Sequence, residues 1–193
     1  MEERGTSGDE GLDVILGGGL PLNGINLIMG LPGSGKTLLC QQLIFARATV
    51  ERPAIYLSTV SEPFEKILRY AQTLSFFDQH AIGRSVFYED LGPTVAGEDG
   101  LTAVTERIAA LIKERRPGII GIDSFKALGA FADDARAFRR FLHELAALLT
   151  AFPPPASGSG NTARRRRARR PSSPSRTESS RSQPTARASA RYA

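Results

Sequence analysis

The residues whose types and spacing are most suited to chemistry form one glycine-rich segment, GLPGSGKT, at positions 30–37. Its spacing, Gly-x4-Gly-Lys-Thr, is that of a P-loop, and it falls between a predicted strand and a predicted helix, as the motif requires. Glycines let backbone N–H groups surround phosphates without a Cβ in the way, and the helix N-terminus adds partial positive charge. The alternative, a chance glycine-rich loop, is disfavoured by this context. We therefore predict a nucleoside triphosphate site made of Gly30, Leu31, Pro32, Gly33, Ser34, Gly35, Lys36, Thr37 and Leu38.

Three side chains are expected to handle the phosphates and a metal ion. Lys36 can reach the β- and γ-phosphates, and the Thr37 hydroxyl can bind Mg²⁺. Asp123 ends the apolar run GIIGI, and a carboxylate at the carboxyl end of a parallel strand opens into the crevice where ligands bind. We expect Asp123 to join Thr37 in holding Mg²⁺, which is the Walker B role. The alternative for Asp123 is a turn residue bonded to its own backbone.

A further carboxylate, Glu62, follows the second predicted strand and has two interpretations. Hydrolysis needs a group that orients the attacking water, and Glu62 is placed at the same rim of the sheet. The helix dipole also favours a carboxylate in the first turn of a helix, which gives Glu62 a purely structural role. The residues alone leave both open. Glu65 lies one turn further on and is expected to face solvent.

Other side chains carry weaker signals. Lys126 either touches a phosphate or lies on the surface, and His80 and His143 have no ligand-like neighbours, which indicates structural or solvated positions. Cys40 is expected to be a buried small side chain on the helix after the P-loop. As the single cysteine it excludes an internal disulfide and fits a reducing compartment.

Apolar patterning predicts the elements that hold these residues. Short apolar runs predict buried strands, and apolar residues at helical spacing predict helices. Strands are expected over 25–30, 54–59, 86–91 and 118–124. Helices are expected over 34–47, from 61 through 74, over 101–112 and over 138–149. Alternating strands and helices, with strands that are apolar on both faces, predict an α/β fold with a parallel sheet.

The charge of the chain is unevenly distributed. Of the net charge of +5, residues 153–193 carry +9, from ten arginines and one glutamate, which leaves −4 for residues 1–152. No Leu, Ile, Val or Phe occurs after Phe152, so this tail cannot bury enough apolar area to offset the entropy of ordering it, and we expect it to be disordered. The arginines can bind nucleic acid through charge. Because they lack interleaved aromatics, we expect no specific nucleic-acid recognition.

The N-terminal residues are polar and acidic, unlike a signal peptide. No apolar run reaches the length of a membrane span, so we expect no membrane partner. Together with the single cysteine, these features predict a cytoplasmic protein.

The segment GLDVILGGGLPLNGINLIMGLPGSGKT, at positions 11–37, resembles the opening of the KaiC branch of the RecA-type ATPases. In that family a glycine-rich LGGGLP turn, a strand and the P-loop follow one another. The SEP segment at 61–63 and the GIIGIDSFKAL segment at 118–128 are also similar to KaiC-like proteins. The resemblance covers residues 11–152.

The resemblance implies ATP as the ligand, Mg²⁺ as the cofactor, and a homo-oligomeric ring, a hexamer, with ATP between subunits. It also implies ATP hydrolysis with Lys36, Glu62 and Asp123 as the catalytic set, and the family includes members with kinase-type activity. KaiC carries paired glutamates after its second strand, whereas the matching positions here are Val60 and Ser61, with Glu62 one place later. A non-hydrolysing ATP sensor and a recombinase-like DNA-binding ATPase remain alternatives.

The tail has a codon-level peculiarity. Codons can be chosen for residues 155–162 so that the same bases, read one base back, encode Ser-Phe-Trp-Val-Gly-Glu-Tyr. Residues 169–180 likewise permit Pro-Glu-Phe-Ala-Val-Ala-Asp-Gly-Ile-Val. Both peptides are similar to strand segments that follow Walker B in KaiC-like proteins. We interpret the tail as a frameshift product, and an authentic basic tail is the alternative.

These observations predict a RecA-like P-loop domain over residues 11–152 that is incomplete at its C-terminal side, with a flexible N-terminus over 1–10 and a disordered tail over 153–193. In RecA-type ATPases a strand after Walker B lies between the Walker B strand and the P-loop strand. The frameshift would remove that strand, so we expect weak or absent ATPase activity and poor folding in this chain.

Overall fold

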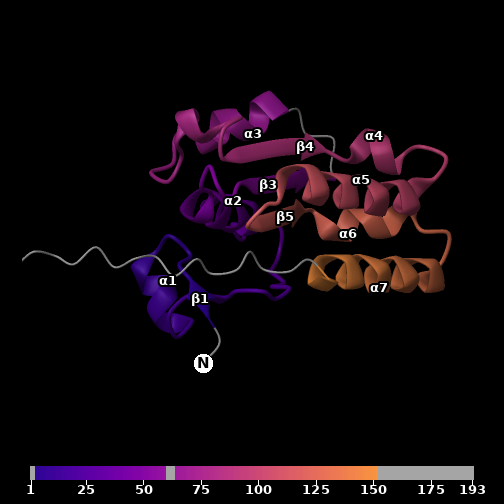
Figure 1. Cartoon of the computed structure of the whole chain (residues 1–193), viewed down its shortest axis with the longest axis horizontal. Coiled ribbons are helices and arrows are strands. Elements are labelled where there is room, and N and C mark those ends of the chain that lie inside the picture. The colour runs from indigo at the N-terminus through magenta and orange to yellow at the C-terminus, as the bar shows by residue number, and fades with distance from the viewer. Residues whose placement is uncertain (1–2, 60–63, 152–193) are drawn as a thin grey trace, which may run out of the picture. The chain divides into compact units, whose positions relative to one another are not determined.

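The computed structural model describes residues 3–59 and 64–151 (Figure 1). By its contacts the chain divides into Met1–Ser157 and Gly158–Ala193, and every described residue belongs to the first unit. The elements are β1 (Arg4–Gly5), α1 (Glu10–Ile15), β2 (Leu20–Pro21), α2 (Lys36–Arg47), β3 (Ala54–Ser58), α3 (Phe64–Ala71), η1 (Gln79–Ala81), β4 (Val86–Asp90), α4 (Gly92–Val95), α5 (Gly100–Arg115), β5 (Ile119–Asp123), α6 (Phe125–Leu128), η2 (Gly129–Phe131) and α7 (Ala135–Ala151).

The main sheet is parallel, in the order β4-β3-β5. Tyr56 in the middle of β3 lies opposite Tyr88 of β4 and Gly121 of β5. Ser58, Asp90 and Asp123 end the three strands in one row, so the polar residues collect at the carboxyl edge. The parallel α/β fold predicted from the sequence is confirmed.

The two faces of β3 serve different parts of the core. Successive side chains of a strand point to opposite faces. Ala54 and Tyr56 therefore pack with Ile44 of α2, while Ile55 and Leu57 pack with α5 and α7. The helix that follows the P-loop accordingly covers the face that carries Tyr56.

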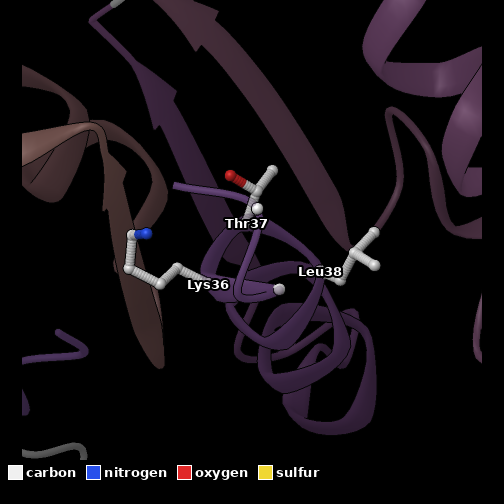
Figure 2. A pocket seen from close by; sticks show the side chains of 5 residues that line it. Lys36, Thr37 and Leu38 are labelled. Carbon is white, nitrogen blue, oxygen red and sulfur yellow. The ribbon is translucent and has the colours of Figure 1, made fainter. Parts of the chain in front are cut away.

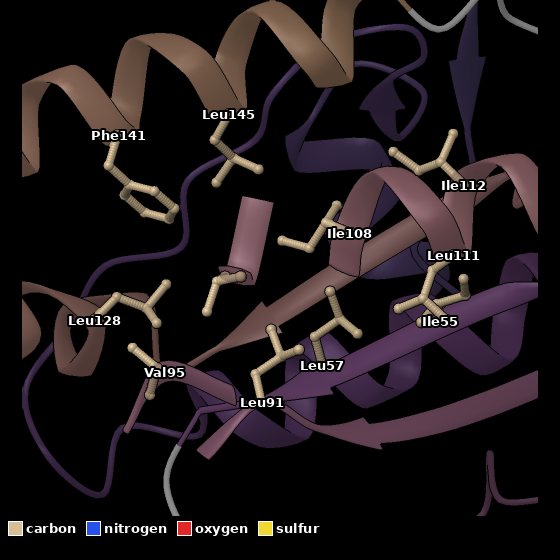
Figure 3. Packing of buried hydrophobic residues seen from close by; sticks show 11 residues of the cluster. Ile55, Leu57, Leu91, Val95, Ile108, Leu111, Ile112, Leu128, Phe141 and Leu145 are labelled. Carbon is tan, nitrogen blue, oxygen red and sulfur yellow. The ribbon is translucent and has the colours of Figure 1, made fainter. Parts of the chain in front are cut away.

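The larger core cluster lies on the face covered by α5 and α7. Figure 3 shows Phe141 and Leu145 of α7 pointing toward Ile108 of α5 and the strands. All three side chains are buried. The helical spacing of residues 101–112 and 138–149 thus predicted two of the helices that cover the sheet, because an apolar stripe must pack against another element.

Residues 3–10, which we expected to be flexible, have defined contacts in the structure. Arg4–Gly5 pair with Leu20–Pro21 in an antiparallel pair, and Arg4 donates to the carbonyl oxygens of Leu16 and Gly19 at 2.8 Å each. The Asp13 carboxylate accepts from Ser7 N at 2.7 Å and from Thr6 Oγ1 at 2.5 Å. The Ser7 side chain, then the Thr6 hydroxyl and the Ser7 backbone N–H, hold the pKa of Asp13 below its usual value.

The predicted strand over 25–30 is wrong. These residues have no secondary structure, and Ile25, Leu27 and Met29 are 58%, 69% and 80% exposed. A strand needs a neighbour for its backbone hydrogen bonds. No strand among residues 3–59 and 64–151 pairs with this segment, since β5 pairs only with β3 there.

Candidate nucleotide-binding site

The loop over residues 30–35 takes its shape from its glycines. Gly33 and Gly35 have φ angles of 78° and 85°, a left-handed conformation that other residues rarely adopt. At Gly30 a Cβ would lie 2.5 Å from the Ser34 hydroxyl oxygen, so only glycine leaves room for that side chain. Gly35 is also the N-cap of α2 and offers no side chain to its amides. The free amides at this helix start are donors for an anion.

Lys36 begins α2 and currently bonds the loop itself. Its Nζ donates to the Leu31 carbonyl oxygen at 2.7 Å. A cavity of about 260 Å³ at the loop is lined by Gly33, Gly35, Lys36, Thr37 and Leu38. Figure 2 shows that the side chains of Lys36, Thr37 and Leu38 leave the first turn of α2 in different directions. The loop therefore has a lysine beside a pocket at a helix N-terminus, which suits a phosphate group.

Thr37 and Asp123 meet although they are 86 positions apart in the chain. Thr37 Oγ1 donates to Asp123 Oδ2 at 2.6 Å. Both side chains supply oxygen atoms, the donors that Mg²⁺ prefers. A threonine hydroxyl keeps lone pairs for a metal while its hydrogen is donated. The pair fits a Mg²⁺ ion held jointly with phosphate oxygens.

Helix packing brings this pair together. A Cβ on Gly121 of β5 would lie 2.7 Å from Cys40 Sγ and 3.4 Å from Ile44 Cδ1, so α2 approaches β5 closely because Gly121 has no side chain. At the end of β5, Thr59 N donates to the Asp123 carbonyl oxygen at 3.0 Å and Thr59 Oγ1 to that of Ser124 at 2.7 Å. The geometry of the Thr37–Asp123 pair is thus set by α2 on one side and by Thr59, the residue after β3, on the other.

Burial changes the acid–base properties of the layer beneath the loop. Burial, and secondarily the nearby Asp123 carboxylate, raise the pKa of the Cys40 thiol to about 12. The same two causes raise the pKa of Tyr56, whose hydroxyl donates to Asp123 Oδ2 at 2.9 Å. Both groups stay protonated at neutral pH. Cys40, which we expected to be a buried small side chain on the helix after the P-loop, lies on α2 as expected but is only partly buried, packed against the smaller core cluster.

Comparison with known proteins identifies the family. The family model of the KaiC ATPase matches residues 6–152. The circadian clock oscillator protein KaiC of Parathermosynechococcus lividus is 33% identical over 150 residues, which cover 74% of this chain and 28% of that protein. KaiC of Thermostichus vulcanus is 32% identical over 144 residues, covering 71% and 28%, and KaiC of a Nostoc species is 29% identical over 165 residues, covering 77% and 32%.

The chain belongs to the KaiC family of ATPases. Its fold is that of a RecA-like P-loop domain, with a parallel sheet and the P-loop at the start of α2. The chain spans between 28% and 32% of the length of these KaiC relatives. No helix among the described residues is both long and apolar enough to cross a membrane.

The structure places the remaining candidate residues of this KaiC-family chain as follows. Glu62 lies outside the described residues, so its two interpretations stay open. Glu65, which follows Glu62 in the sequence, belongs to α3. Lys126, His80 and His143 are exposed, and none of their side chains bonds a P-loop residue or Asp123 among the described residues. Of the sequence candidates, the structure brings together the P-loop residues and Asp123.

Two residues of the site escaped sequence analysis. Tyr56 and Thr59 contact Asp123 through a hydroxyl and a backbone N–H respectively. Tyr56 lies inside the apolar run of β3, where a tyrosine is typical of a buried strand and gives no separate signal. Strand alternation does provide a signal, because it places every second residue of β3 on the face that α2 covers.

Proposed function

We propose that this chain binds Mg²⁺-ATP at the loop over residues 30–38, with Asp123 as its metal-binding carboxylate. The observation that carries the proposal is the 2.6 Å bond from Thr37 to Asp123, directly beside a P-loop at a helix N-terminus. Membership of the KaiC ATPase family supports nucleotide binding at the level of the family. ATP as the specific nucleotide and Mg²⁺ as the metal are parts of the proposal.

Different groups at the loop bind the phosphates and the metal ion. Backbone amides from Gly33 to Leu38 donate to phosphate oxygens, helped by the dipole of α2. Lys36 exchanges its bond to the Leu31 carbonyl oxygen for one to phosphate, because a charge-assisted bond is stronger than a bond to a neutral carbonyl. Bound Mg²⁺ neutralises charge on the β- and γ-phosphates. Thr37 and Asp123 hold it in place.

ATP hydrolysis is proposed for the version of the protein with the frame restored, with Glu62 orienting the water. In this chain we expect little or no turnover, because the frameshift would remove the strand that follows Walker B in RecA-type ATPases. Glu62→Gln in the frame-restored protein should leave ATP binding unchanged and lower turnover at saturating ATP. Unchanged turnover would assign Glu62 to the start of α3 alone.

Oligomerisation and location belong to the proposal as well. The resemblance to KaiC supports a homo-oligomeric ring, a hexamer, with ATP between subunits, and sedimentation with and without Mg²⁺-ATP tests it. The single cysteine supports a cytoplasmic location.

Two alternative functions can be distinguished from ATP hydrolysis by experiment. A non-hydrolysing ATP sensor is favoured by the missing glutamate pair, and it predicts ATP binding without turnover even in the frame-restored protein. A recombinase-like DNA binder predicts salt-dependent DNA affinity in residues 1–152. The net charge of −4 on that segment argues against it.

The test of ATP binding is calorimetric titration of the full chain with ATP and Mg²⁺. Lys36→Ala should weaken binding at least about a hundredfold, since it removes a charged partner of the phosphates. Lys113→Ala is the matched control, because Lys113 is an exposed lysine near the C-terminus of α5. Equal affinity of the parent chain and Lys36→Ala would contradict the proposal, as would the absence of binding to the parent.

A further inference from the structure

The face of the sheet beneath α2 carries a tyrosine that points at the metal-binding carboxylate. Tyr56 on β3 is paired in register with Gly121 on β5, and Ser58 with Asp123. Alternation puts Tyr56, Gly121 and Asp123 on the same face. Tyr56 and Gly121 are therefore neighbours on the face that leads to the Asp123 side chain at the end of β5.

The Tyr56 hydroxyl reaches the same carboxylate oxygen that Thr37 uses. Tyr56 OH donates to Asp123 Oδ2 at 2.9 Å, and Thr37 Oγ1 donates to that oxygen at 2.6 Å. A carboxylate held by two donors from different elements has little freedom to rotate about its terminal torsion, which is otherwise broad. The two bonds thus fix the direction in which Asp123 faces the loop.

Tyr56 is itself held rigidly. Its side chain is 2% exposed, and its ring packs on Tyr88 with centroids 5.1 Å apart. The buried, packed ring therefore holds the hydroxyl beside the Asp123 carboxylate.

We propose that Tyr56 is a positioning residue for magnesium, whose hydroxyl orients Asp123 so that the carboxylate and Thr37 together hold Mg²⁺ in the nucleotide complex. The inference rests on the proposed function, since it concerns the metal of the Mg²⁺-ATP complex. It assigns Tyr56 no contact with ATP. The hydroxyl matters for the metal and not for the phosphates, which the loop amides and Lys36 bind.

The test is a Mg²⁺ titration of nucleotide binding in the full chain, with the fluorescent analogue N-methylanthraniloyl-ATP as the probe. Tyr56→Phe keeps the buried ring and removes only the hydroxyl. We expect the Mg²⁺ concentration for half-maximal binding to rise about two- to tenfold, the effect of losing one hydrogen bond. Affinity for the probe in EDTA should stay equal to that of the parent chain.

Tyr88→Phe is the matched control, because it removes a hydroxyl from the neighbouring ring, which packs on Tyr56 at an interplanar angle of 44°, and leaves the Tyr56–Asp123 bond in place. Its Mg²⁺ requirement should match that of the parent. An unchanged Mg²⁺ requirement in Tyr56→Phe overturns the inference while the proposed function stands. Equal weakening of binding with Mg²⁺ and in EDTA also overturns it, because the hydroxyl would then act on the fold. A parent chain that does not bind the probe overturns both.

Discussion

Thr37 donates a hydrogen bond to Asp123. It does so although residues 25–30, which lead into the P-loop, are not part of the sheet. Direct pairing of the segment before the P-loop with β5 would move Asp123 relative to Thr37. The segment 25–30 stays unpaired among the described residues, and α2 packs on β5 by itself. The position of Thr37 therefore depends on helix-to-sheet packing more than on the strand that leads into the loop.

The close approach of α2 to β5 predicts a strong effect at Gly121. Gly121→Ala places a Cβ 2.7 Å from Cys40 Sγ and 3.4 Å from Ile44, which forces the helix outward. We expect the free energy of unfolding to fall by about 1–3 kcal/mol. Urea unfolding followed by circular dichroism measures the change.

Two further variants make this test specific. Gly121→Ala combined with Cys40→Ala removes the sulfur that the new Cβ meets, and it should recover part of the lost stability. Gly24→Ala is the control, because a Cβ there meets no atom within 4 Å. If the double variant is no more stable than Gly121→Ala, the contact between Cys40 and Gly121 does not set the helix position.

The Cys40 thiol should react slowly in the folded protein. Burial raises its pKa from 9.0 to about 12, so at about pH 8 the thiolate fraction is on the order of a thousandfold smaller than in the unfolded chain. Reaction with Ellman's reagent, compared in buffer and in urea, measures this. Because Cys40 is the only cysteine, the signal has one source. Equal rates in both solvents would show that the thiol is not buried.

The same shift has a consequence for stability at high pH. Below pH 9.0 the thiol is protonated in both states, and its contribution is fully present. As the pH rises from 9.0 toward 12, the unfolded chain releases the proton while the folded chain keeps it, so the free energy of unfolding decreases. Cys40→Ala should lose this part of the pH dependence.

Sequence patterns predicted the parts of the fold that depend on local periodicity. Apolar spacing predicted β3, β4, β5, α5 and α7, because the pattern of apolar residues within each element shows which of its side chains are buried. The meeting of Thr37 with Asp123 followed from the P-loop and the carboxyl end of a strand. The segment 25–30 could not be assigned in this way, because whether an apolar run becomes a strand depends on a distant partner. Tyr56 was missed because its function depends on a contact across three elements.

The unpaired segment 25–30 gives a test of the missing-strand hypothesis. Its backbone amides should exchange with deuterium far faster than those of β3, whose residues are all buried and paired on both sides. In a chain with the reading frame restored after Phe152, we expect the same amides to become protected. Resequencing the gene at the codons for 152–155 checks the frame itself. Protection of 25–30 in the present chain would contradict the hypothesis.

The most direct test of the site is a double-mutant cycle on Thr37→Ala and Asp123→Asn, read as the affinity for ATP with Mg²⁺ and with EDTA. If the two residues hold one metal ion, each single variant should lower the affinity for ATP with Mg²⁺ about tenfold or more. The double variant should then lose no more affinity than the single variant with the larger loss. Affinity in EDTA should stay the same in all four proteins. A shared Mg²⁺ site at Thr37 and Asp123 would be contradicted if the fold-losses in affinity of the two substitutions multiplied in the double variant. It would also be contradicted if the same losses appeared in EDTA.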